Sequence, residues 1–199
     1  LDLQNVGNVD SGVRTAYEIV DFDPDLIILT GICGGFRTNK NVSLGDVIVA
    51  TKIVYYELGK MEKSIISRRV KVVNVEESIL EHVKLAIDSK WPLTALNHTS
   101  KILRKPKVIF APIASGEKVV AEKKFQDELI DIEKNTIAIE MEGYGVIRAA
   151  NLAKTKPKVL VIKSIGDWAD DSKNDEFQNK ASEIAASLVT FTILNIKSI

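Results

Sequence analysis

The stretch LIILTGICGGF, residues 26–36, decides the fold, because an apolar run passes there directly into a run of glycines. The apolar residues 26–29 follow Pro24 and lead to Gly31, a pattern typical of a buried strand that ends in a turn. Glycines at such a place let the backbone approach a ligand closely. Their spacing fits neither the G-x-G-x-x-G dinucleotide pattern nor the P-loop, so a ligand site of another kind and a plain tight turn both stay open.

On both sides of this stretch, short β-branched runs alternate with longer helical patterns. We expect strands at 46–54, 68–75, 108–113 and 159–165, with a shorter one at 136–139, and helices at 11–20, 76–88, 122–132, 141–153 and 176–196. The first helix would be capped by Asp10 or Ser11, and 90–105 would form a surface connection. The alternation predicts one α/β domain over residues 1–199, a three-layer domain in which helices flank a mixed, twisted central sheet.

Composition and charge narrow the possible functions. The 199 residues are 45% hydrophobic and 27% charged, as in an ordinary folded protein. The 27 Lys and Arg residues balance the 27 Asp and Glu residues, so the chain shows no basic footprint for nucleic acid. It also has no apolar run long enough to span a membrane.

The supply of metal-ligating side chains argues against a metal or another cofactor. Cys33 is the single cysteine, and His82 and His98 are the two histidines, so the sequence provides no Cys/His zinc site and no internal disulfide. A chain without disulfides indicates a reducing compartment, of which the cytoplasm is the simplest choice. We therefore predict no metal, no cofactor and a cytoplasmic location.

The segment AIEMEGYG, residues 138–145, places two acids where a short strand gives way to a helix. Glu140 and Glu142 are two residues apart, so they point in different directions and need not share one task. A Glu at a helix start is favoured by the helix dipole alone, which explains one acid more easily than both. Gly143 and Gly145 each cost about 1 kcal/mol relative to Ala in a helix, which indicates that close packing or a ligand needs the room.

Two further segments follow predicted strands: ASGE at 114–117 and KSIGDWADD at 163–171. Taken alone, Asp167 fits a solvated turn or a helix cap as well as a catalytic acid held by a rigid strand. All of these segments come after apolar strands, and in open α/β sheets ligands lie beyond the carboxyl ends of strands. One cleft could therefore collect them.

The order and wording of the segments resemble a known family. T-G-x-x-G-G, then L-G-D-V-I-V-A at 44–50, A-S-G-E, E-M-E-G at 140–143 and I-G-D-x-A-D at 165–170 are similar to motifs of the purine nucleoside phosphorylase and nucleosidase superfamily. The likeness is greatest to methylthioadenosine/S-adenosylhomocysteine nucleosidases and related domains. It implies a nucleoside held on a twisted mixed sheet and cleavage of the bond between base and ribose.

The resemblance also implies roles for single residues. Met141 and Glu142 would contact the ribose, Asp167 would be the general acid for the purine N7, and Val119 and Val120 would line the base pocket. The predicted catalytic residues are Asp167 and Glu142, and the predicted substrate contacts are Gly31, Ile32, Val119, Val120, Glu140, Met141 and Glu142.

The resemblance favours hydrolysis over phosphorolysis. Where the phosphorylases bind phosphate with Arg and Ser, this chain has Leu29 and Ile32. The chain departs from the family elsewhere too: Val119 replaces a Phe, Gly166 replaces a Ser, and the upstream Glu that activates water has no counterpart. Because residues 1–5 match an internal strand of the family, we expect at least one earlier strand to be missing and the chain to be a fragment of a longer protein.

Several functions stay open. The first is hydrolysis of the N-glycosidic bond of a purine nucleoside or nucleotide, with release of the free base. The others are a nucleotide-binding sensor or effector module of a larger signalling or defence protein, a phosphorolytic enzyme, and a structural protein without a ligand. The expected partners are a small-molecule nucleoside or nucleotide and further copies of the chain, as a homodimer or higher homo-oligomer, with no nucleic acid and no membrane.

Overall fold

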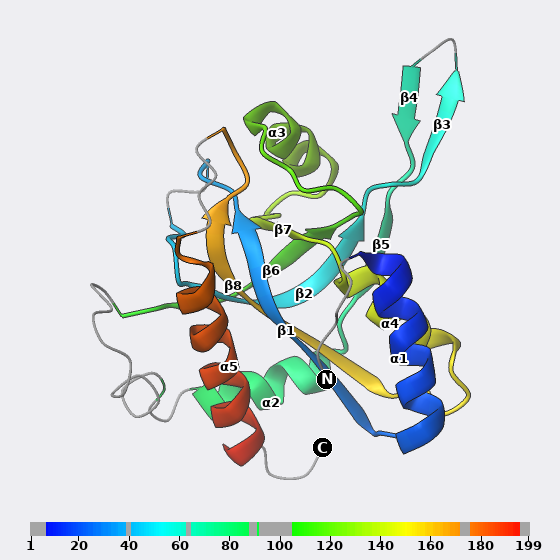
Figure 1. Ribbon diagram of the computed structural model, residues 1–199, viewed down its shortest axis with the longest axis vertical. Helices are drawn as coiled ribbons and strands as arrows, with labels where there is room; N and C mark the ends of the chain where they lie inside the picture. Colours follow the sequence, from blue (N-terminus) through cyan, green and yellow to red (C-terminus); the bar gives the residue numbers. More distant parts are fainter. Residues whose placement is uncertain are drawn as a thin grey trace.

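The computed structural model describes residues 7–38, 41–62, 65–87, 91, 105–171 and 176–195 (Figure 1). In chain order the elements are α1 (Asn8–Phe22), β1 (Leu26–Gly35), β2 (Val47–Tyr55), β3 (Gly59–Glu62), β4 (Ile65–Arg68), β5 (Lys71–Asn74), α2 (Glu77–Ile87), β6 (Val108–Ser115), α3 (Lys123–Ile132), β7 (Ala138–Glu140), α4 (Gly143–Leu152), β8 (Lys158–Trp168) and α5 (Gln178–Asn195). The alternation of strands and helices follows the prediction.

The six-stranded sheet is mixed and closes on itself. Its order is β5-β2-β6-β7-β1-β8, and β8 pairs with β2 as well. The pairs β1–β8, β2–β6 and β6–β7 are parallel, whereas β1–β7, β2–β5 and β2–β8 are antiparallel. The prediction of a mixed central sheet is therefore confirmed, and its curl brings strands from both halves of the chain together.

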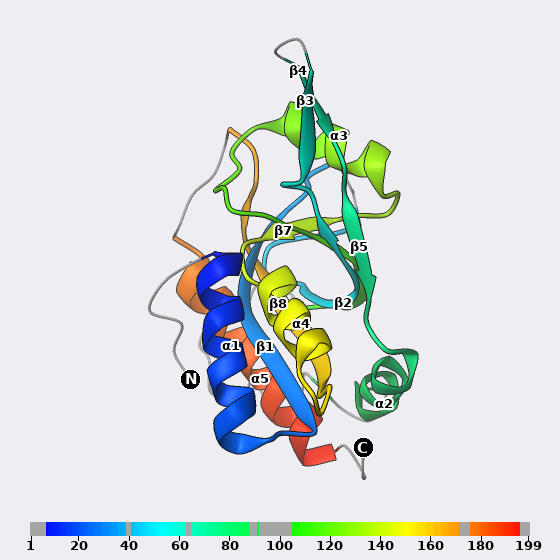
Figure 2. The same ribbon diagram turned by 90° about the vertical axis from the view of Figure 1, so that its right-hand side faces the viewer.

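Helices cover the sheet, as predicted. α5 packs on β1 and β8, and it does so through Ala181, Ile184, Ala185 and Leu188, which are buried. α1 and α4 lie side by side, and α4 contacts β8 and β2 (Figure 2). The middle of β8 and most of β2 are buried, as near-continuous apolar runs between layers should be.

β1 does not end at Gly31, so the predicted turn there is wrong. The strand continues to Gly35, because Gly34 and Gly35 pair with β7 on one side and with β8 on the other. A β-carbon on Gly35 would lie 2.7 Å from the Ile165 Cγ2 atom, which is too close. The glycine run thus allows close packing inside the sheet.

The predicted strand 68–75 is two strands, because the chain changes partners. β4 pairs with β3 to form a hairpin that projects from the body, whereas β5 pairs with β2 (Figure 1). Between them, the Arg69 amide donates a hydrogen bond to the Leu58 carbonyl (2.7 Å).

The start of α1 also differs from the prediction. The helix begins at Asn8, and its N-cap is Gly7, which has no side chain to offer. The Asn8 amide instead donates to the Glu117 carboxylate (3.0 Å), from a loop far away in the sequence. A cap by Asp10 or Ser11 was therefore wrong, because tertiary contact supplies the acceptor that a local side chain usually provides.

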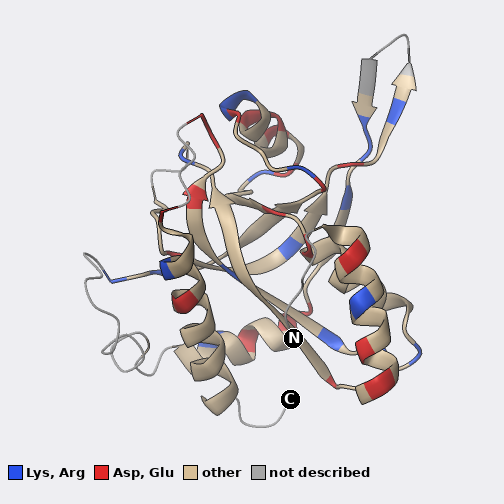
Figure 3. Cartoon of the chain, in the orientation of Figure 1, with Lys and Arg blue, Asp and Glu red and all other residues tan. Residues whose placement is uncertain are grey.

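Two predictions fall on residues that the structure does not describe: the match of residues 1–5 to an internal strand, and most of the connection 90–105. Within the described part of the chain, no helix has the length and apolar character needed to cross a membrane. Lys and Arg are scattered among Asp and Glu along the chain (Figure 3).

Candidate active site

A cavity of about 250 Å³ gathers the segments that the sequence singled out. It lies where β1, the loop after β6, the end of β7 and the end of β8 meet, and it is named the small cavity below. Its walls are formed by Ile32, Cys33, Gly34, Lys118, Val119, Val120, Ile139, Glu140, Met141, Glu142, Asp167, Ala169 and Gln178. All predicted site residues line it except Gly31, which faces the Lys163 side chain instead.

Sheet register explains why distant segments meet here. Gly34 of β1 pairs with Ile139 of β7 and with Asp167 of β8, so one glycine lies between the E-M-E-G and G-D-x-A-D segments. A β-carbon on Gly34 would lie 2.9 Å from the Ala169 Cβ atom and 3.2 Å from the Asp167 Oδ1 atom. The absence of a side chain therefore leaves room for the Asp167 carboxylate at the cavity wall.

Glu140 starts helix α4. Its carboxylate accepts hydrogen bonds from the amides of Glu142 (2.9 Å) and Gly143 (2.8 and 3.0 Å), which satisfies the free N–H groups of the first turn. The side chain is fully buried. A β-carbon on Gly143 would lie 2.9 Å from the Glu140 Oε1 atom, so the absence of a side chain at Gly143 leaves room for the Glu140 carboxylate.

Lys163 is a buried charged residue next to the small cavity that the sequence reasoning missed. Its Nζ atom lies 2.9 Å from the Glu142 Oε2 atom and 3.3 Å from the Glu140 Oε2 atom, and its side chain is 3% exposed. Burial acts to lower the pKa of Lys163, but the charges of Glu140 and Glu142 outweigh it and raise the pKa above 10.5. A lysine inside the apolar strand VLVIKSI was a signal, because a buried ammonium needs an acidic partner.

The two acids of E-M-E-G therefore have different surroundings. Glu140 is closed off by backbone amides, whereas Glu142 is partly exposed and lines the small cavity with one oxygen on Lys163. The backbone carbonyl of Glu142 is also fixed, since the Ser11 hydroxyl donates to it (2.9 Å). Both residues line the small cavity, but only the Glu142 side chain keeps some solvent exposure.

Asp167 lies at the end of β8, mostly buried, and faces the same cavity. Arg37 contacts two residues at this end of the strand, Trp168 and Asp170. Its guanidinium lies 4.7 Å from the centre of the Trp168 ring, and its Nε atom is 3.0 Å from the Asp170 Oδ2 atom.

The loop after β6 forms the open wall of the small cavity. Val119 is 68% exposed, while Val120 is half-buried. Lys118 forms an ion pair with Glu57. Partial burial acts to raise the pKa of Glu57, but hydrogen bonds from Lys118 and from the Glu117 amide hold that pKa below 4.5.

Cys33, on the β1 side of the small cavity, adds no charged group to the wall. Burial raises the pKa of the Cys33 thiol, so this side chain stays neutral in the cavity wall. Among the residues that the structure describes, no cluster of three His, Cys, Asp or Glu side chains could hold a metal ion.

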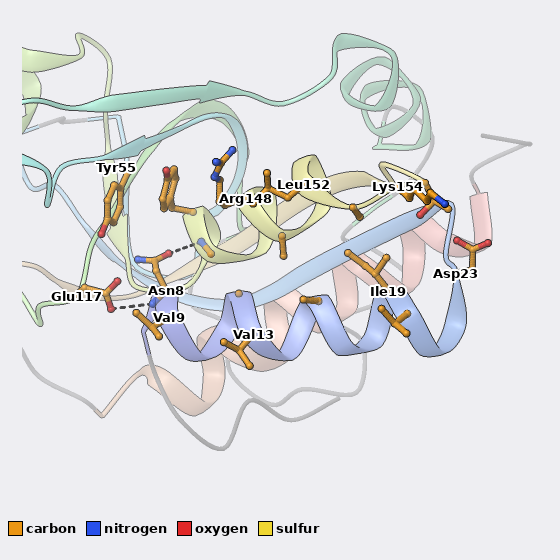
Figure 4. Close-up of a pocket in the computed structure, with 18 residues that line it drawn as sticks. Asn8, Val9, Val13, Ile19, Asp23, Tyr55, Glu117, Arg148, Leu152 and Lys154 are labelled. Carbon is orange, nitrogen blue, oxygen red and sulfur yellow. Dashed lines mark hydrogen bonds between the residues drawn. The ribbon is translucent and has the colours of Figure 1, made fainter.

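A second hollow, of about 760 Å³, lies between α1 and α4 and is named the α1–α4 groove (Figure 4). Its lining is mostly apolar, with Val9, Val13 and Ile19 from α1 and Leu152 from α4. The polar residues at one end, Asn8 and Glu117, belong to the network behind the small cavity.

A mixed sheet between helices, with convergent carboxylates in a cavity among strand ends, defines an α/β protein of the kind in which small-molecule sites lie at strand ends. The profile of the Phosphorylase superfamily matches residues 3–193, so the chain belongs to this superfamily.

Two curated relatives and one solved structure illustrate the kinship. The "Uncharacterized protein y4jS" of Sinorhizobium fredii is 29% identical over 96% of this chain, and "ATP nucleosidase Cap17" of Escherichia coli is 24% identical over 94%. The chain spans only 48% and 39% of the length of these two relatives. The structure of 5'-methylthioadenosine/S-adenosylhomocysteine nucleosidase from Neisseria meningitidis, in complex with methylthio-immucillin-A, has the same fold. Its TM-score is 0.75 and its sequence 21% identical, over 95% of this chain and 78% of that one.

Proposed function

We propose that this domain hydrolyses the N-glycosidic bond of a purine nucleoside or nucleotide and releases the free base. The observation that carries the proposal is that Asp167 at the end of β8 lines one cavity with Met141 and Glu142 in the turn from β7 to α4. Membership of the Phosphorylase superfamily and similarity to proteins named as nucleosidases support it.

Each end of the small cavity has a role in this reaction. Glu142 accepts hydrogen bonds from the ribose hydroxyls, and Met141 packs on the sugar. The Lys163 Nζ atom lies 2.9 Å from the Glu142 carboxylate and holds it in place, and hydrogen bonds to a carboxylate are stronger than bonds to a neutral acceptor. Glu140 also lines the cavity, so its substrate contact stays a prediction, and its carboxylate in addition positions the start of α4.

Asp167 donates a proton to the purine N7 while Val119 and Val120 hold the base. As the bond from base to sugar breaks, its electron pair moves onto the purine and the sugar becomes oxocarbenium-like. A proton at N7 stabilises the departing base, so a positioned acid accelerates this step.

Water is the proposed nucleophile. At the positions that bind phosphate in the phosphorylases, Leu29 is buried in β1 and Ile32 presents an apolar side chain to the cavity. Lys118 also lines the cavity, but its charge is paired with Glu57. We assign no water-activating group among the described residues.

A second candidate is a nucleotide-binding module of a larger signalling or defence protein. The lengths of y4jS and Cap17, of which this chain spans half or less, favour it. Such a module would bind a nucleotide in the same cavity without turnover. Phosphorolysis is the third candidate, and it would require phosphate.

We also propose that the protein is cytoplasmic and forms a homodimer or higher homo-oligomer. The single buried cysteine is compatible with a reducing compartment. On α1, Val9, Val13 and Val20 are more than half exposed beside the α1–α4 groove. Exposed apolar patches mark protein interfaces. The groove is also lined by both acidic and basic residues, so the same surface of a second chain would be complementary to it.

Incubation of the full-length protein with a panel of purine nucleosides and nucleotides tests the function. Chromatography of the products, with and without phosphate, separates the three candidates. We expect free base and free sugar in both buffers. Ribose 1-phosphate formed only with phosphate would establish a phosphorylase, and tight binding without any base release would establish the sensor.

A further inference from the structure

Asn8 is a buried side chain at one end of the α1–α4 groove, where it joins three elements (Figure 4). It belongs to the first turn of α1. Its Oδ1 atom accepts hydrogen bonds from the Gly145 amide (2.8 Å) and the Ser115 hydroxyl (3.0 Å), and its Nδ2 atom donates to the Gly116 carbonyl (3.0 Å). One amide thereby ties α1 to the end of β6 and to the first turn of α4.

The chemistry of these partners fixes the orientation of the amide. The Gly145 N–H can only donate and the Gly116 carbonyl can only accept, so oxygen and nitrogen cannot exchange places. Aspartate has the same shape but no donor for the Gly116 carbonyl. Position 8 therefore requires both halves of an amide.

The tied segments carry the groups that face the ligand. Gly145 lies three residues after Glu142, on the same helical turn, and the Ser11 hydroxyl of α1 holds the Glu142 carbonyl (2.9 Å). Gly116 begins the loop that continues to Val119. The Gly116 amide donates to the Glu140 carbonyl (3.2 Å), which closes the network around both segments.

α1 and α4 are tightly packed at Gly145. A β-carbon on Gly145 would overlap the Asn8 carbonyl oxygen, so α1 and α4 touch backbone to backbone at this point. A shift of Asn8 would consequently move the start of α4, and with it Glu142.

We propose that Asn8 is a positioning residue for the nucleoside site: it holds the first turn of α4 so that Glu142 meets the ribose. This inference rests on the proposed function. It locates a determinant of ribose affinity on α1, outside the cavity lining.

The test compares Asn8→Ala and Asn8→Asp with Thr15→Ala in the full-length protein. Thr15 is also a buried polar residue of α1, but it is one that lines neither hollow. The readouts are KM and kcat for the best purine nucleoside, the inhibition constant of the free purine base, and Tm.

We expect both Asn8 variants to raise KM about 10- to 100-fold, because small misplacements of a binding group are costly. The inhibition constant of the free base should rise less than KM, since the free base does not use Glu142 and is linked to Asn8 only through the loop that begins at Gly116. Thr15→Ala should lower Tm without raising KM. Equal KM values in all variants, or equal losses for nucleoside and free base, would overturn the inference.

Hydrogen exchange keeps the two proposals separable. If the wild type neither cleaves nor binds a nucleoside, the proposed function fails. The amide exchange rates then test whether Asn8 still holds the two tied segments in place. Faster exchange at 115–118 and 142–146 in Asn8→Ala, but not in Thr15→Ala, supports the positioning role. Unchanged exchange in those segments overturns it.

Discussion

The small cavity and the α1–α4 groove share a wall and differ in chemistry. The groove is the larger, at about 760 Å³ against about 250 Å³, and its lining includes three valines, three alanines, an isoleucine and a leucine. The small cavity is lined by Glu142 and Asp167, and the buried Lys163 is paired with Glu142. Acidic groups at the end of β8 and at the start of α4 converge in the small cavity, and this convergence, rather than volume, is why we place the proposed nucleoside site there.

The shared wall is the first turn of α4. Glu142 faces the small cavity, whereas Tyr144 and Gly145 line the groove. Apart from Asn8 at one end of the groove, substitutions on the two sides of this wall should therefore have separable effects: those in the small cavity should change catalysis, and those in the groove should change assembly.

The largest effect is expected from Asp167→Asn. The amide keeps the shape but cannot transfer a proton, and general acid catalysis supplies about 10²–10⁴-fold, so kcat should fall by that factor. Binding of the nucleoside should stay nearly unchanged. Asp170→Asn is the matched control, because Asp170 pairs with Arg37 and does not line the cavity. Base release by Asp167→Asn at a near-normal rate would contradict the assignment.

Lys163→Met should destabilise the fold by about 3–5 kcal/mol, because it leaves buried acids without their cation. The half-exposed Lys52, paired with Glu133 at 2.9 Å, gives the control. Lys52→Met should cost about 1 kcal/mol or less in urea unfolding. Equal losses for the two variants would show that Lys163 is not an essential partner of the acids.

The pH dependence of stability tests whether Lys163 is charged in the folded protein. Since Glu140 and Glu142 raise the folded pKa of Lys163 above its ordinary value of 10.5, its contribution is complete below pH 10.5 and is lost as pH rises through the folded pKa. The free energy of unfolding of the wild type should therefore fall more steeply above pH 10.5 than that of Lys163→Met. Parallel curves would argue against a charged Lys163 in the folded state.

Glu142→Gln should raise KM about tenfold or more, because charge-assisted bonds to the ribose hydroxyls become neutral ones. Turnover should fall as well. Glu133→Gln, on the surface ion pair with Lys52, should leave both constants unchanged. A Glu142→Gln enzyme with normal KM would place the ribose elsewhere.

The smallest effect on chemistry is expected on the groove side. Val13→Glu puts a charge on an exposed apolar position of α1, so it should convert a homo-oligomer into a monomer and leave kcat unchanged. Light scattering after gel filtration measures the mass. If the wild type is already a monomer at micromolar concentration, the proposed homo-oligomer is wrong.

Local patterns predicted much of this molecule. Apolar runs ended by glycines or acids indicated β1, β6 and β8, and α2, α3, α4 and α5 lie within two residues of their predicted ends. The acids at 140 and 142 were recognised as candidates for separate tasks, and their surroundings differ accordingly.

Contacts between distant segments could not be predicted in this way. The cap of α1 comes from Glu117, and the room that Gly145 leaves is filled by the backbone of Asn8. The turn expected at Gly31 failed because the pairing of Gly34 with both β7 and β8 extends β1. Periodicity reports which face of an element is buried, but it does not report which partner covers that face.

The central claim is that the small cavity releases a purine and that the α1–α4 groove does not. The most direct measurement is the rate of free-base release in phosphate-free buffer by the wild type, Asp167→Asn and Val13→Glu side by side. We predict equal rates per chain for the wild type and Val13→Glu. For Asp167→Asn we predict a rate reduced by at least about 100-fold. A full rate in Asp167→Asn, or release that depends on added phosphate, would contradict the account.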